Sequence, residues 1–378
     1  MKILILNWRD PKSPLEGGAE RFTQKYAEFW AKNGHEVYWL TNSFPNCLPK
    51  EKRRGVTYHR VGPQMDGSFL RYLVCFPLYL ITAVRFAITL IQQEDIDIVI
   101  DEIHGLPHFA PLFSRKRNIL LTCEVAGVIW DKTFPFPIST IGKWVERQIY
   151  KLYRNCDIWA ISKNTKRNIS QLLPRKKVGI LELGVEKNSA LLHQIRKVHK
   201  NNYPSAIFLA RLVKMKGVES ALRATAQIAH RYPKFKLTIV GKGSQMYEQE
   251  LRELVTSLQI TKNVEFIGFK DGIAKYRELK KAHVLLHPSY KEGFGLTVLE
   301  AGLVGTPAIV RSGSSLDDLV ENDVNGFVFS KASQIAHCFT KLYSGKSYRT
   351  LERGAVKKAS YYLWPDVLQR SSKMTTIC

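Results

Sequence analysis

The sequence has few cysteines and lacks the short motifs that mark several common protein classes. Its six cysteines are scattered over 378 residues, and no two of them form a C-x-x-C pair. That pattern argues against a structural metal and a disulfide framework, and it fits a reducing cytoplasm. No G-x-G-x-x-G follows an expected first strand and no Walker sequence occurs, so a plain dehydrogenase or ATPase is disfavoured.

Signatures of nucleic-acid binding are also lacking, although the formal net charge of +24 would suit such a partner. There is no zinc-finger spacing, no aromatic-rich single-strand signature and no basic region leading into heptads. The positive excess is spread over both halves in short clusters, among them 52–54, 115–117 and 175–177. Such clusters are typical of solvated faces. The positive electrostatic field of these clusters would attract nucleotide phosphates or an acidic membrane leaflet. Because the nucleic-acid signatures are lacking, we expect no specific nucleic-acid partner.

Export signals are not expected either. The segment Met1–Asn7 carries one charge and a short apolar strand, which is too brief for a signal peptide. The stretch Phe69–Ile91 is long enough to span a bilayer, but it contains Arg71 and Arg85 and is interrupted by Pro77. Arginine at bilayer depth costs at least about 2.5 kcal/mol. We therefore expect a buried or interfacial helix pair here, in a cytoplasmic protein peripheral on the inner membrane face.

What the sequence does contain is one theme, an apolar strand followed by a loop and a helix, used in both halves. In the first half a helix is expected over Ala19–Asn33, and strands over Lys2–Leu6, Glu36–Thr41, Asp97–Ile100, Asn118–Thr122 and Asp157–Ile161. In the second half a helix is expected over Val218–His230, and strands over Ala206–Ala210, Lys236–Val240, Asn263–Ile267, Ala282–Leu286 and Pro307–Val310. This alternation predicts an α/β protein with two parallel-sheet, Rossmann-like domains facing a cleft. The D-x-D sequence Asp95–Asp97 is expected to be a strand-entry turn rather than a metal site.

The segment Glu292–Glu300 is the most informative part of the chain. It joins a glycine-bearing loop to the start of an apolar helix, with one carboxylate in the loop and another about two turns inside the helix. The first N–H groups of a helix point outward and carry partial positive charge, and glycines let a bulky anion reach them. A carboxylate beyond that anion can accept hydrogen bonds from sugar hydroxyls. The segment therefore indicates a site for a sugar attached to a diphosphate.

This segment resembles the E-x7-E motif of retaining glycosyltransferases with the GT-B fold, in the set known as family 4 or group 1. The flanking residues agree: 287–290 (HPSY), 300–302 (EAG), 305–307 (GTP) and 325–328 (NGFV). Residues 210–217 (ARLVKMKG) are similar to the family's basic phosphate loop, and 17–20 (GGAE) to its N-terminal acceptor-side loop. The resemblance covers nearly the whole chain and is most specific in the second half.

The resemblance implies a role for each matching residue. Arg211 and Lys216 would neutralise the leaving phosphate, and Glu292 would accept from the transferred sugar. The remaining positions are expected to bind the donor: Gly17 and Gly18 at the phosphate, Phe269 and Lys270 at the base, Gly295, Leu296 and Thr297 at the helix terminus, and Glu300 at the ribose. No metal and no cofactor besides the nucleotide-diphosphate sugar is expected.

The sequence departs from the family at one place. Many relatives have a histidine after the strand that ends at Thr122, whereas this chain has Glu124 at that position. A carboxylate there could hold a sugar hydroxyl, accept the acceptor's proton or form a structural salt bridge. His104 and His108 follow the preceding strand and are alternatives for a catalytic role, with packed or surface histidines as the other interpretation.

The resemblance thus implies a metal-independent, retaining hexosyltransferase that acts on a glycan or lipid-linked acceptor in cell-surface polysaccharide synthesis. The polar segment Leu183–Pro204 lacks a strand pattern and marks the domain boundary. With the roles that the resemblance implies, residues 1–185 form an acceptor-side domain and 186–358 a nucleotide-sugar domain. Residues 359–378 would form a C-terminal helix that crosses back to the first domain, anchored by aromatic side chains. A catalytically silent nucleotide-sugar or glycan-binding protein is the alternative, because Glu124 replaces the histidine.

Overall fold

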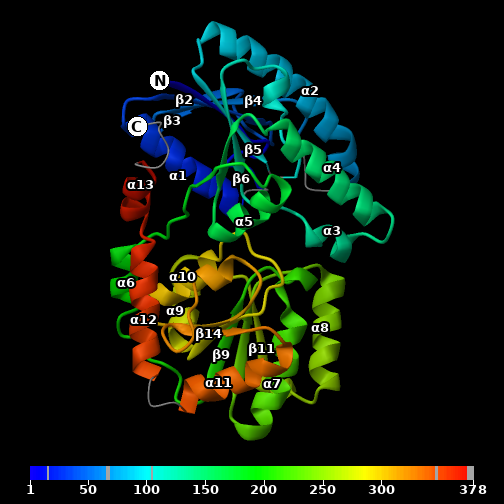
Figure 1. Cartoon of the computed structure of the whole chain (residues 1–378). Coiled ribbons are helices and arrows are strands. Elements are labelled where there is room, and N and C mark those ends of the chain that lie inside the picture. Colours follow the sequence, from blue (N-terminus) through cyan, green and yellow to red (C-terminus); the bar gives the residue numbers. More distant parts are fainter. Residues whose placement is uncertain (15–16, 65–68, 104, 345–347, 373–378) are drawn as a thin grey trace. The chain divides into compact units, whose positions relative to one another are not determined.

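The structure is a computed structural model that describes residues 1–14, 17–64, 69–103, 105–344 and 348–372. The chain forms two compact units, which are coloured by sequence in Figure 1. The first unit comprises Met1–Glu182 together with the residues from Leu368 onward, and the second comprises Leu183–Val367. The sequence had placed the boundaries after residues 185 and 358.

The first unit is built on an eight-stranded sheet with the order β3-β4-β2-β1-β5-β6-β7-β8. Its strands are β1 (Lys2–Leu6), β2 (Glu36–Asn42), β3 (Lys50–Arg53), β4 (Val56–Val61), β5 (Ile98–Ile103), β6 (Arg117–Thr122), β7 (Asp157–Ala160) and β8 (Val178–Ile180). Every pairing is parallel except that of β3 with β4. The helices are α1 (Gly18–Lys32), α2 (Phe69–Gln93), α3 (Val128–Thr133), α4 (Ile138–Leu152) and α5 (Lys163–Leu172).

The two faces of this sheet are covered by different helices, because alternate side chains of a strand point to opposite faces. Leu4 and Val99 pack with side chains of α2, and Leu120, which shares their face by register, packs with side chains of α4. On the other face Trp159 lies 6.4 Å from Trp30 of α1, measured between ring centroids. Both faces are therefore buried, as a parallel sheet requires.

The helix α2 contains Pro77 within one continuous span, so the expected helix pair is a single helix. Among the described residues, its part Val74–Gln93 is long and apolar enough to cross a membrane. This is weak evidence, because a core helix meets the same criterion. One face of α2, including Phe76, Tyr79 and Ala83, is buried against the sheet.

The second unit is built on a six-stranded, all-parallel sheet with the order β11-β10-β9-β12-β13-β14. Its strands are β9 (Ser205–Leu209), β10 (Lys236–Val240), β11 (Val264–Gly268), β12 (Val284–His287), β13 (Ala308–Arg311) and β14 (Gly326–Phe329). Its helices include α6 (Ser189–Gln194), α7 (Val218–Arg231), α8 (Gln245–Ser257), α9 (Gly272–Lys281), α10 (Leu296–Leu303), α11 (Ile335–Ser344) and α12 (Tyr348–Tyr361). These two sheets confirm the predicted α/β fold class.

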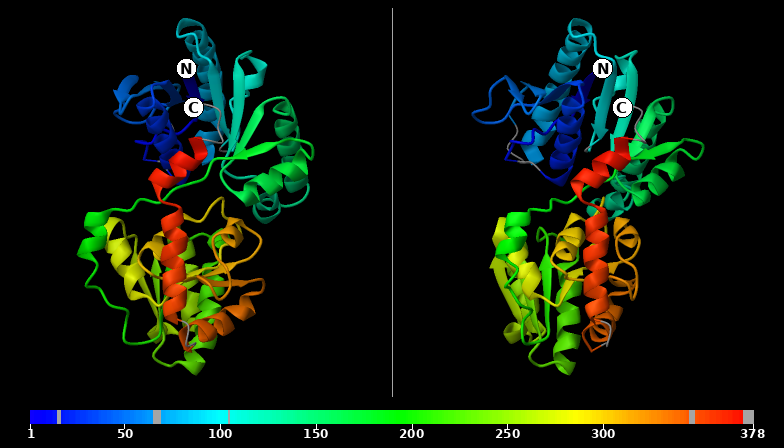
Figure 2. Two further views of the ribbon diagram at one scale, coloured as in Figure 1. Left: turned by 60° about the vertical axis from the view of Figure 1, so that its left-hand side comes forward. Right: turned by 90° about the vertical axis from the view of Figure 1, so that its left-hand side faces the viewer.

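The helix α12 packs along α10, as the two views of Figure 2 allow the reader to follow. The contact is close because Gly302 has no side chain: a Cβ atom there would lie 2.7 Å from the carbonyl oxygen of Ala355. The packing holds α10, whose first residue follows the glycine-bearing loop, firmly against the body of the second unit.

The C-terminal helix α13 (Trp364–Ser372) has contacts of two kinds. Its polar end belongs to the first unit, where the hydroxyl of Tyr26 lies 2.8 Å from Ser371 Oγ and Arg370 lies 3.0 Å from Glu182. The aromatic residues before that end stay in the second unit: Trp364 covers Gly184, and Tyr362 lies 5.5 Å from the ring of Phe294. The polar end of the tail thus belongs to the first unit, and the expectation that aromatic side chains anchor the tail there stays a prediction.

Candidate active site

The strand order of the second unit reverses between β9 and β12. From β9 the chain continues to β10 on one side, whereas β12 lies on the other side of β9 and the chain continues from it to β13. The loops that follow β9 and β12 leave the same edge of the sheet and diverge there, which is the usual ligand site of an open parallel sheet. The loop after β9 carries Arg211 and Lys216, and the loop after β12 carries Glu292.

These two loops place Lys216 and Glu292 in contact. Lys216 Nζ lies 2.6 Å from Glu292 Oε1, and His287 Nε2 lies 2.8 Å from the same oxygen. The side chains of Lys216 and Glu292 are 19% and 13% exposed, so the pair is largely shielded but still reachable. Met215 O accepts hydrogen bonds from Tyr290 N and Ser289 Oγ, which ties the two loops together next to the pair.

The pair makes Glu292 an unusually strong acid. Burial on its own would raise its pKa, but the hydrogen bond and charge of His287, together with Lys216, lower the pKa from 4.5 to about 2. Glu292 is therefore ionised throughout the physiological range. An ionised carboxylate only accepts hydrogen bonds, and this is what a sugar hydroxyl needs from its partner.

The depressed pKa of Glu292 predicts a pH dependence of folding. A carboxyl group with a folded pKa below its unfolded one contributes stability above pH 4.5 that is lost as the pH falls towards 2. Between pH 5 and pH 3 we expect wild type to lose about 2 kcal/mol more unfolding free energy than Glu292→Gln. Urea unfolding at both pH values measures this difference. The same pH dependence of unfolding free energy in both proteins would contradict this prediction. Glu278→Gln is the control: it removes another lysine-paired carboxylate and should show the pH dependence of wild type.

Two glycines let the loops adopt their shapes. Gly217 has φ +72°, and a Cβ atom there would lie 2.3 Å from the carbonyl oxygen of Pro288. Gly295 has φ +110°, and a Cβ atom there would lie 2.6 Å from Leu316 Cδ2. Any other residue would strain the backbone and push apart groups that now touch. The two glycines thus allow both loops to approach the same point.

Gly295 is the N-cap of α10, so Leu296 and Thr297 begin the helix directly after the loop. Their N–H groups belong to the first turn, which has no carbonyl partner inside the helix and carries partial positive charge. The loop is fixed on its other side by Ser315 of the turn Ser315–Asp318, whose hydroxyl donates to the backbone carbonyl of Glu292. A helix terminus therefore follows Glu292 on the same loop, while the lysine that contacts Glu292 comes from the loop after β9.

Glu300 lies inside α10 and points towards α9. Its Oε1 lies 2.8 Å from Lys275 Nζ, and Lys275 also lies 4.0 Å from Asp271 Oδ1. The side chain of Glu300 is 19% exposed, so part of its carboxylate is accessible. Lys275 fixes the direction of that carboxylate, and the role of Glu300 at the ribose stays a prediction.

The other expected donor residues of the second unit lie on loops that leave the carboxyl ends of β9 and β11. Arg211 is exposed and follows β9 by two residues. Phe269, the first residue after β11, is 64% exposed, and Lys270 is the next residue. Their assignments to phosphate and base remain predictions.

In the first unit, Gly17 and Gly18 lie at the start of α1. The N–H of Gly17 donates to Glu20 Oε2 at 2.7 Å, and the fully buried Glu20 also lies 3.8 Å from Arg9 Nη1. A phosphate that used the Gly17 amide would have to compete with Glu20. The role of both glycines at the donor stays a prediction.

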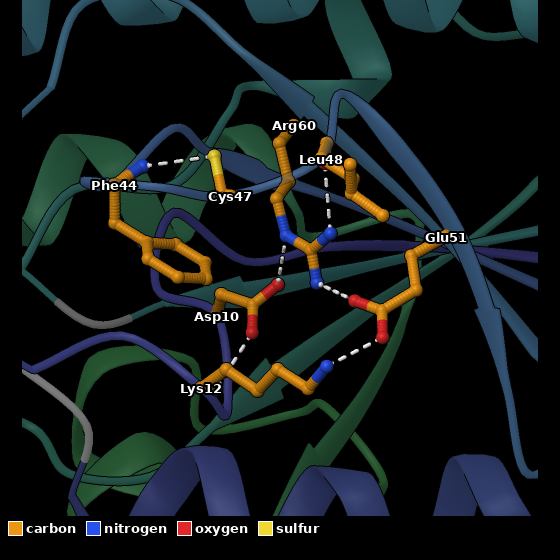
Figure 3. A network of polar contacts seen from close by, with 7 residues as sticks. All are labelled: Asp10, Lys12, Phe44, Cys47, Leu48, Glu51 and Arg60. Atoms are coloured by element: carbon orange, nitrogen blue, oxygen red, sulfur yellow. Dashed lines mark hydrogen bonds and ion pairs between the residues drawn. The ribbon is translucent and has the colours of Figure 1, made fainter.

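The loop that leads from β1 towards Gly17 is held by a buried guanidinium, which Figure 3 shows. Arg60 on β4 donates to Asp10 and to Glu51, each at 2.8 Å, and to the carbonyl oxygen of Leu48 at 2.8 Å. Lys12 donates to Glu51 as well, and these hydrogen bonds lower the pKa of Glu51. A buried charge with several partners fixes its surroundings, so this network determines where the loop leaves the sheet.

The strand β5 carries two carboxylates that the sequence did not single out. Asp101 accepts from Tyr153 Oη at 2.5 Å, from Ala110 N at 3.0 Å and from His108 N at 2.9 Å. Burial, together with the charge of Glu20, raises the pKa of Glu102 to about 8. Glu102 is held by Asn7 Nδ2 at 2.8 Å and Thr23 Oγ1 at 2.7 Å, and so it joins the ends of β1 and β5 to α1.

The histidine alternatives have different outcomes. His104 lies outside the described residues, so its expected role stays a prediction. His108 is buried, with Nε2 2.8 Å from Tyr79 Oη and Nδ1 3.2 Å from Asp101, which favours the packed interpretation. Glu124 is half-buried directly after Cys123, beyond the end of β6, and its role at the sugar also stays a prediction.

The D-x-D sequence forms the turn that precedes β5. Asp95 has φ +47° and pairs with Lys116 at 2.9 Å, while Asp97 accepts from the backbone N–H of Lys2 at 2.7 Å. The expected strand-entry turn is confirmed. Within the described part of the chain, no three His, Cys, Asp or Glu side chains are grouped as a metal site would need. The expectation of a metal-independent reaction stays a prediction.

The chain matches known families along most of its length. Residues 193–355 match the model described as glycosyl transferases group 1, and residues 16–188 match the model described as glycosyltransferase family 4. An uncharacterized glycosyltransferase of Methanocaldococcus jannaschii is 26% identical over 98% of this chain and 97% of its own length.

Solved structures give the same picture for the fold. Sucrose-phosphate synthase from Thermosynechococcus elongatus has a TM-score of 0.79 at 16% identity, covering 98% of this chain and 97% of its own. Anabaena HepE, solved in complex with UDP-glucose, has a TM-score of 0.72 at 18% identity, covering 99% of this chain and 98% of its own. At these identities the likeness establishes the architecture of two parallel-sheet domains.

Proposed function

Because the chain belongs to the group 1 and family 4 glycosyltransferases with the GT-B fold, we propose that it is a retaining hexosyltransferase. Its donor would be a nucleotide-diphosphate sugar, and its acceptor a hydroxyl group on a glycan or lipid-linked saccharide. The observation that carries this proposal is the contact between Lys216 and Glu292 at the strand-order reversal, beside the N-terminus of α10. A cation, a helix terminus and an ionised carboxylate together suit a diphosphate joined to a sugar.

The proposed chemistry begins with breaking the bond between the sugar and the diphosphate. Negative charge then develops on the leaving phosphate, and Lys216, Arg211 and the first N–H groups of α10 would stabilise it. Hydrogen bonds to charged groups contribute about 1.5–3 kcal/mol each, which is one to two decades of rate if they form fully in the transition state. Glu292 would hold a hydroxyl of the transferred sugar, and Glu300 would hold the ribose.

Retention follows in this proposal from attack on the face that the leaving group departs from. The acceptor hydroxyl would attack the anomeric carbon while the leaving phosphate takes its proton, so no separate general base is needed. The protein's cations would supply the neutralising charge without a metal ion. We place the reaction in cell-surface polysaccharide synthesis, in the cytoplasm at the inner membrane face, where lipid-linked acceptors are exposed.

A thermal-shift panel of UDP-, GDP- and ADP-sugars tests donor binding. A ligand present at about 100 times its dissociation constant stabilises the folded protein by about 2.7 kcal/mol. We expect one nucleotide class to raise the melting temperature by several degrees and the other two to have smaller effects. Glu300→Ala should remove about half of that shift or more. No shift with any nucleotide-diphosphate sugar would contradict the proposed donor.

A catalytically silent nucleotide-sugar or glycan-binding protein is the second candidate. The observation that favours it is Glu124, which stands where many relatives carry a histidine. A silent binder would give the same thermal shift as an enzyme but would release no nucleoside diphosphate. Turnover that is measurable in wild type and lost in both Glu292→Ala and Glu300→Ala would exclude it.

A further inference from the structure

The helix α4 of the first unit turns an apolar strip away from the core. One side of the helix is buried, including Ile149 and Tyr150. Another side is exposed and carries Trp144 at 62%, Ile141 at 57% and Ile138 at 51% exposure, with Val145 beside them. Residues at positions 138, 141 and 145 have the spacing of one helical face, and position 144 is three residues from 141. The four side chains therefore form one continuous apolar strip.

A row of cations runs next to this apolar strip. Lys143, Arg147 and Lys151 are exposed and spaced by four residues, so they lie one above the other along α4. From Val128 to Arg154 the sequence contains five Lys or Arg residues and two carboxylates. One of those carboxylates, Glu146, accepts from the backbone N–H groups of Ala126 and Gly127. The other, Asp131, forms an exposed pair with Lys143, and such pairs are weak.

The cationic row ends at an open recess of about 440 Å³ in the surface of the first unit. Its wall includes Lys151 and Arg154 at the end of α4, and Arg175 and Lys176 in the loop after α5. Four cations around a cavity of this size suit a phosphate-bearing group. Because Lys151 belongs to both features, the strip, the row and the recess form one surface, which we call the α4 surface.

We propose that the α4 surface docks the protein on a bilayer containing anionic phospholipid. The apolar strip would enter the boundary between headgroups and acyl chains, the cationic row would lie at the level of the phosphates, and the recess would take one headgroup. An apolar strip flanked by Lys and Arg is the pattern of helices that lie in the membrane interface. This proposal rests on the location at the inner membrane face proposed above. None of its residues belongs to the candidate active site, so vesicle binding and sugar transfer can fail separately.

The positive charge next to the apolar strip is the reason for assigning membrane docking to α4 rather than to the more apolar α2. Val74, Leu78 and Ile81 of α2 are also exposed, but the segment Val74–Gln93 contains Arg85 as its single cation. Attraction to an anionic surface is worth roughly fivefold in affinity for each nearby Lys or Arg. The three cations of the row would then raise the affinity for an anionic membrane about a hundredfold.

Vesicle binding by the full-length protein tests the proposal. We expect binding to phosphatidylcholine vesicles that contain 30% phosphatidylglycerol, and at least tenfold weaker binding to pure phosphatidylcholine. Trp144 supplies a direct readout, because it is the exposed tryptophan while the other six are buried or half-buried. Its fluorescence should shift to the blue on anionic vesicles, and Trp144→Phe should remove that shift while the protein still binds.

Charge variants separate this surface from general attraction by a cationic protein. Lys143→Gln, Arg147→Gln and Lys151→Gln combined should weaken binding to anionic vesicles about a hundredfold. The matched control combines Arg349→Gln, Arg353→Gln and Lys357→Gln, which removes an exposed row of the same charge and spacing from α12. That control should stay within about threefold of wild type. Melting temperatures within about 2 °C of wild type establish that both variants are folded.

Three results would overturn the proposal. The first is equal binding to neutral and anionic vesicles, and the second is an equal loss of binding in the α4 and α12 variants. The third is a dimer, detected by light scattering, that Trp144→Ser dissociates while no vesicle binding occurs. In that case the strip serves contact between copies of this chain.

Discussion

We expect Lys216→Ala to lower kcat/KM for sugar transfer by about 10- to 150-fold, which corresponds to the loss of one charged hydrogen bond in the transition state. Lys216 is the cation that the structure places in direct contact with Glu292, at the point where the loops after β9 and β12 meet. Its removal takes away a positive charge that the leaving diphosphate needs. It also leaves the largely shielded Glu292 carboxylate with one fewer partner. Steady-state kinetics with the donor identified by thermal shift measure the effect.

The matched control for this variant is Lys214→Ala. Lys214 belongs to the same short turn, Lys214–Lys216, but its side chain is 77% exposed and lies 3.9 Å from Glu250 on α8. We expect this variant to keep at least half of the wild-type kcat/KM. If Lys216→Ala were folded and also stayed within twofold of wild type, Lys216 would have no role at the phosphate.

The second large effect is expected on donor binding. Glu300→Ala should weaken the affinity for the nucleoside diphosphate by about 10- to 150-fold, because a ribose hydroxyl would lose a charged acceptor. Folding should change little, since Lys275 keeps Asp271 as a neighbour at 4.0 Å and the Glu300 pair is partly exposed. Isothermal titration with the nucleoside diphosphate measures the dissociation constants of wild type and variant.

Glu278→Ala is the control for Glu300→Ala. Glu278 lies on α9 with Lys275 and also pairs with a lysine, Lys281, at 2.7 Å. The change removes a carboxylate of similar exposure without touching the expected ribose position. Equal affinities of wild type and Glu300→Ala for the nucleotide would show that this carboxylate does not contact the donor.

The sequence was sufficient for the central strands because each contains at least three apolar residues close together. Lys2–Leu6 and Lys236–Val240 have the predicted bounds, and the other central strands differ by one to three residues at an end. The missed strands are edge or near-edge elements. For example, β3 (Lys50–Arg53) consists entirely of charged residues, and β8 (Val178–Ile180) has only three residues. Pairing in the sheet rather than apolar pattern determines such strands.

The strand β5 illustrates a second limit. The prediction ended it at Ile100, before two carboxylates, whereas the structure continues it to Ile103. Buried charges are tolerated only where partners satisfy them, and here those partners come from Asn7, Thr23, His108 and Tyr153. Their positions depend on the folded chain, so the sequence could not indicate them.

For the candidate site, the sequence shows local patterns but not the pairs that their residues form. The loop 210–217 and the segment Glu292–Glu300 could each be found alone, whereas the contact between Lys216 and Glu292 joins residues 76 positions apart. Lys275, the partner of Glu300, carried no local signal. His287 does carry a local signal, because a histidine that ends a buried strand lies at the edge of the sheet where ligands bind.

The most direct test of the proposed transferase is a time course of donor cleavage with product analysis. Wild type is incubated with the preferred nucleotide-diphosphate hexose in the presence of EDTA. Release of nucleoside diphosphate is followed, and the anomeric configuration of the first sugar product is read by NMR. We predict release well above that of a Lys216→Ala, Glu292→Ala double variant, with the donor's anomeric configuration retained. Release equal to that of the double variant, or a product of inverted configuration, would contradict the proposal.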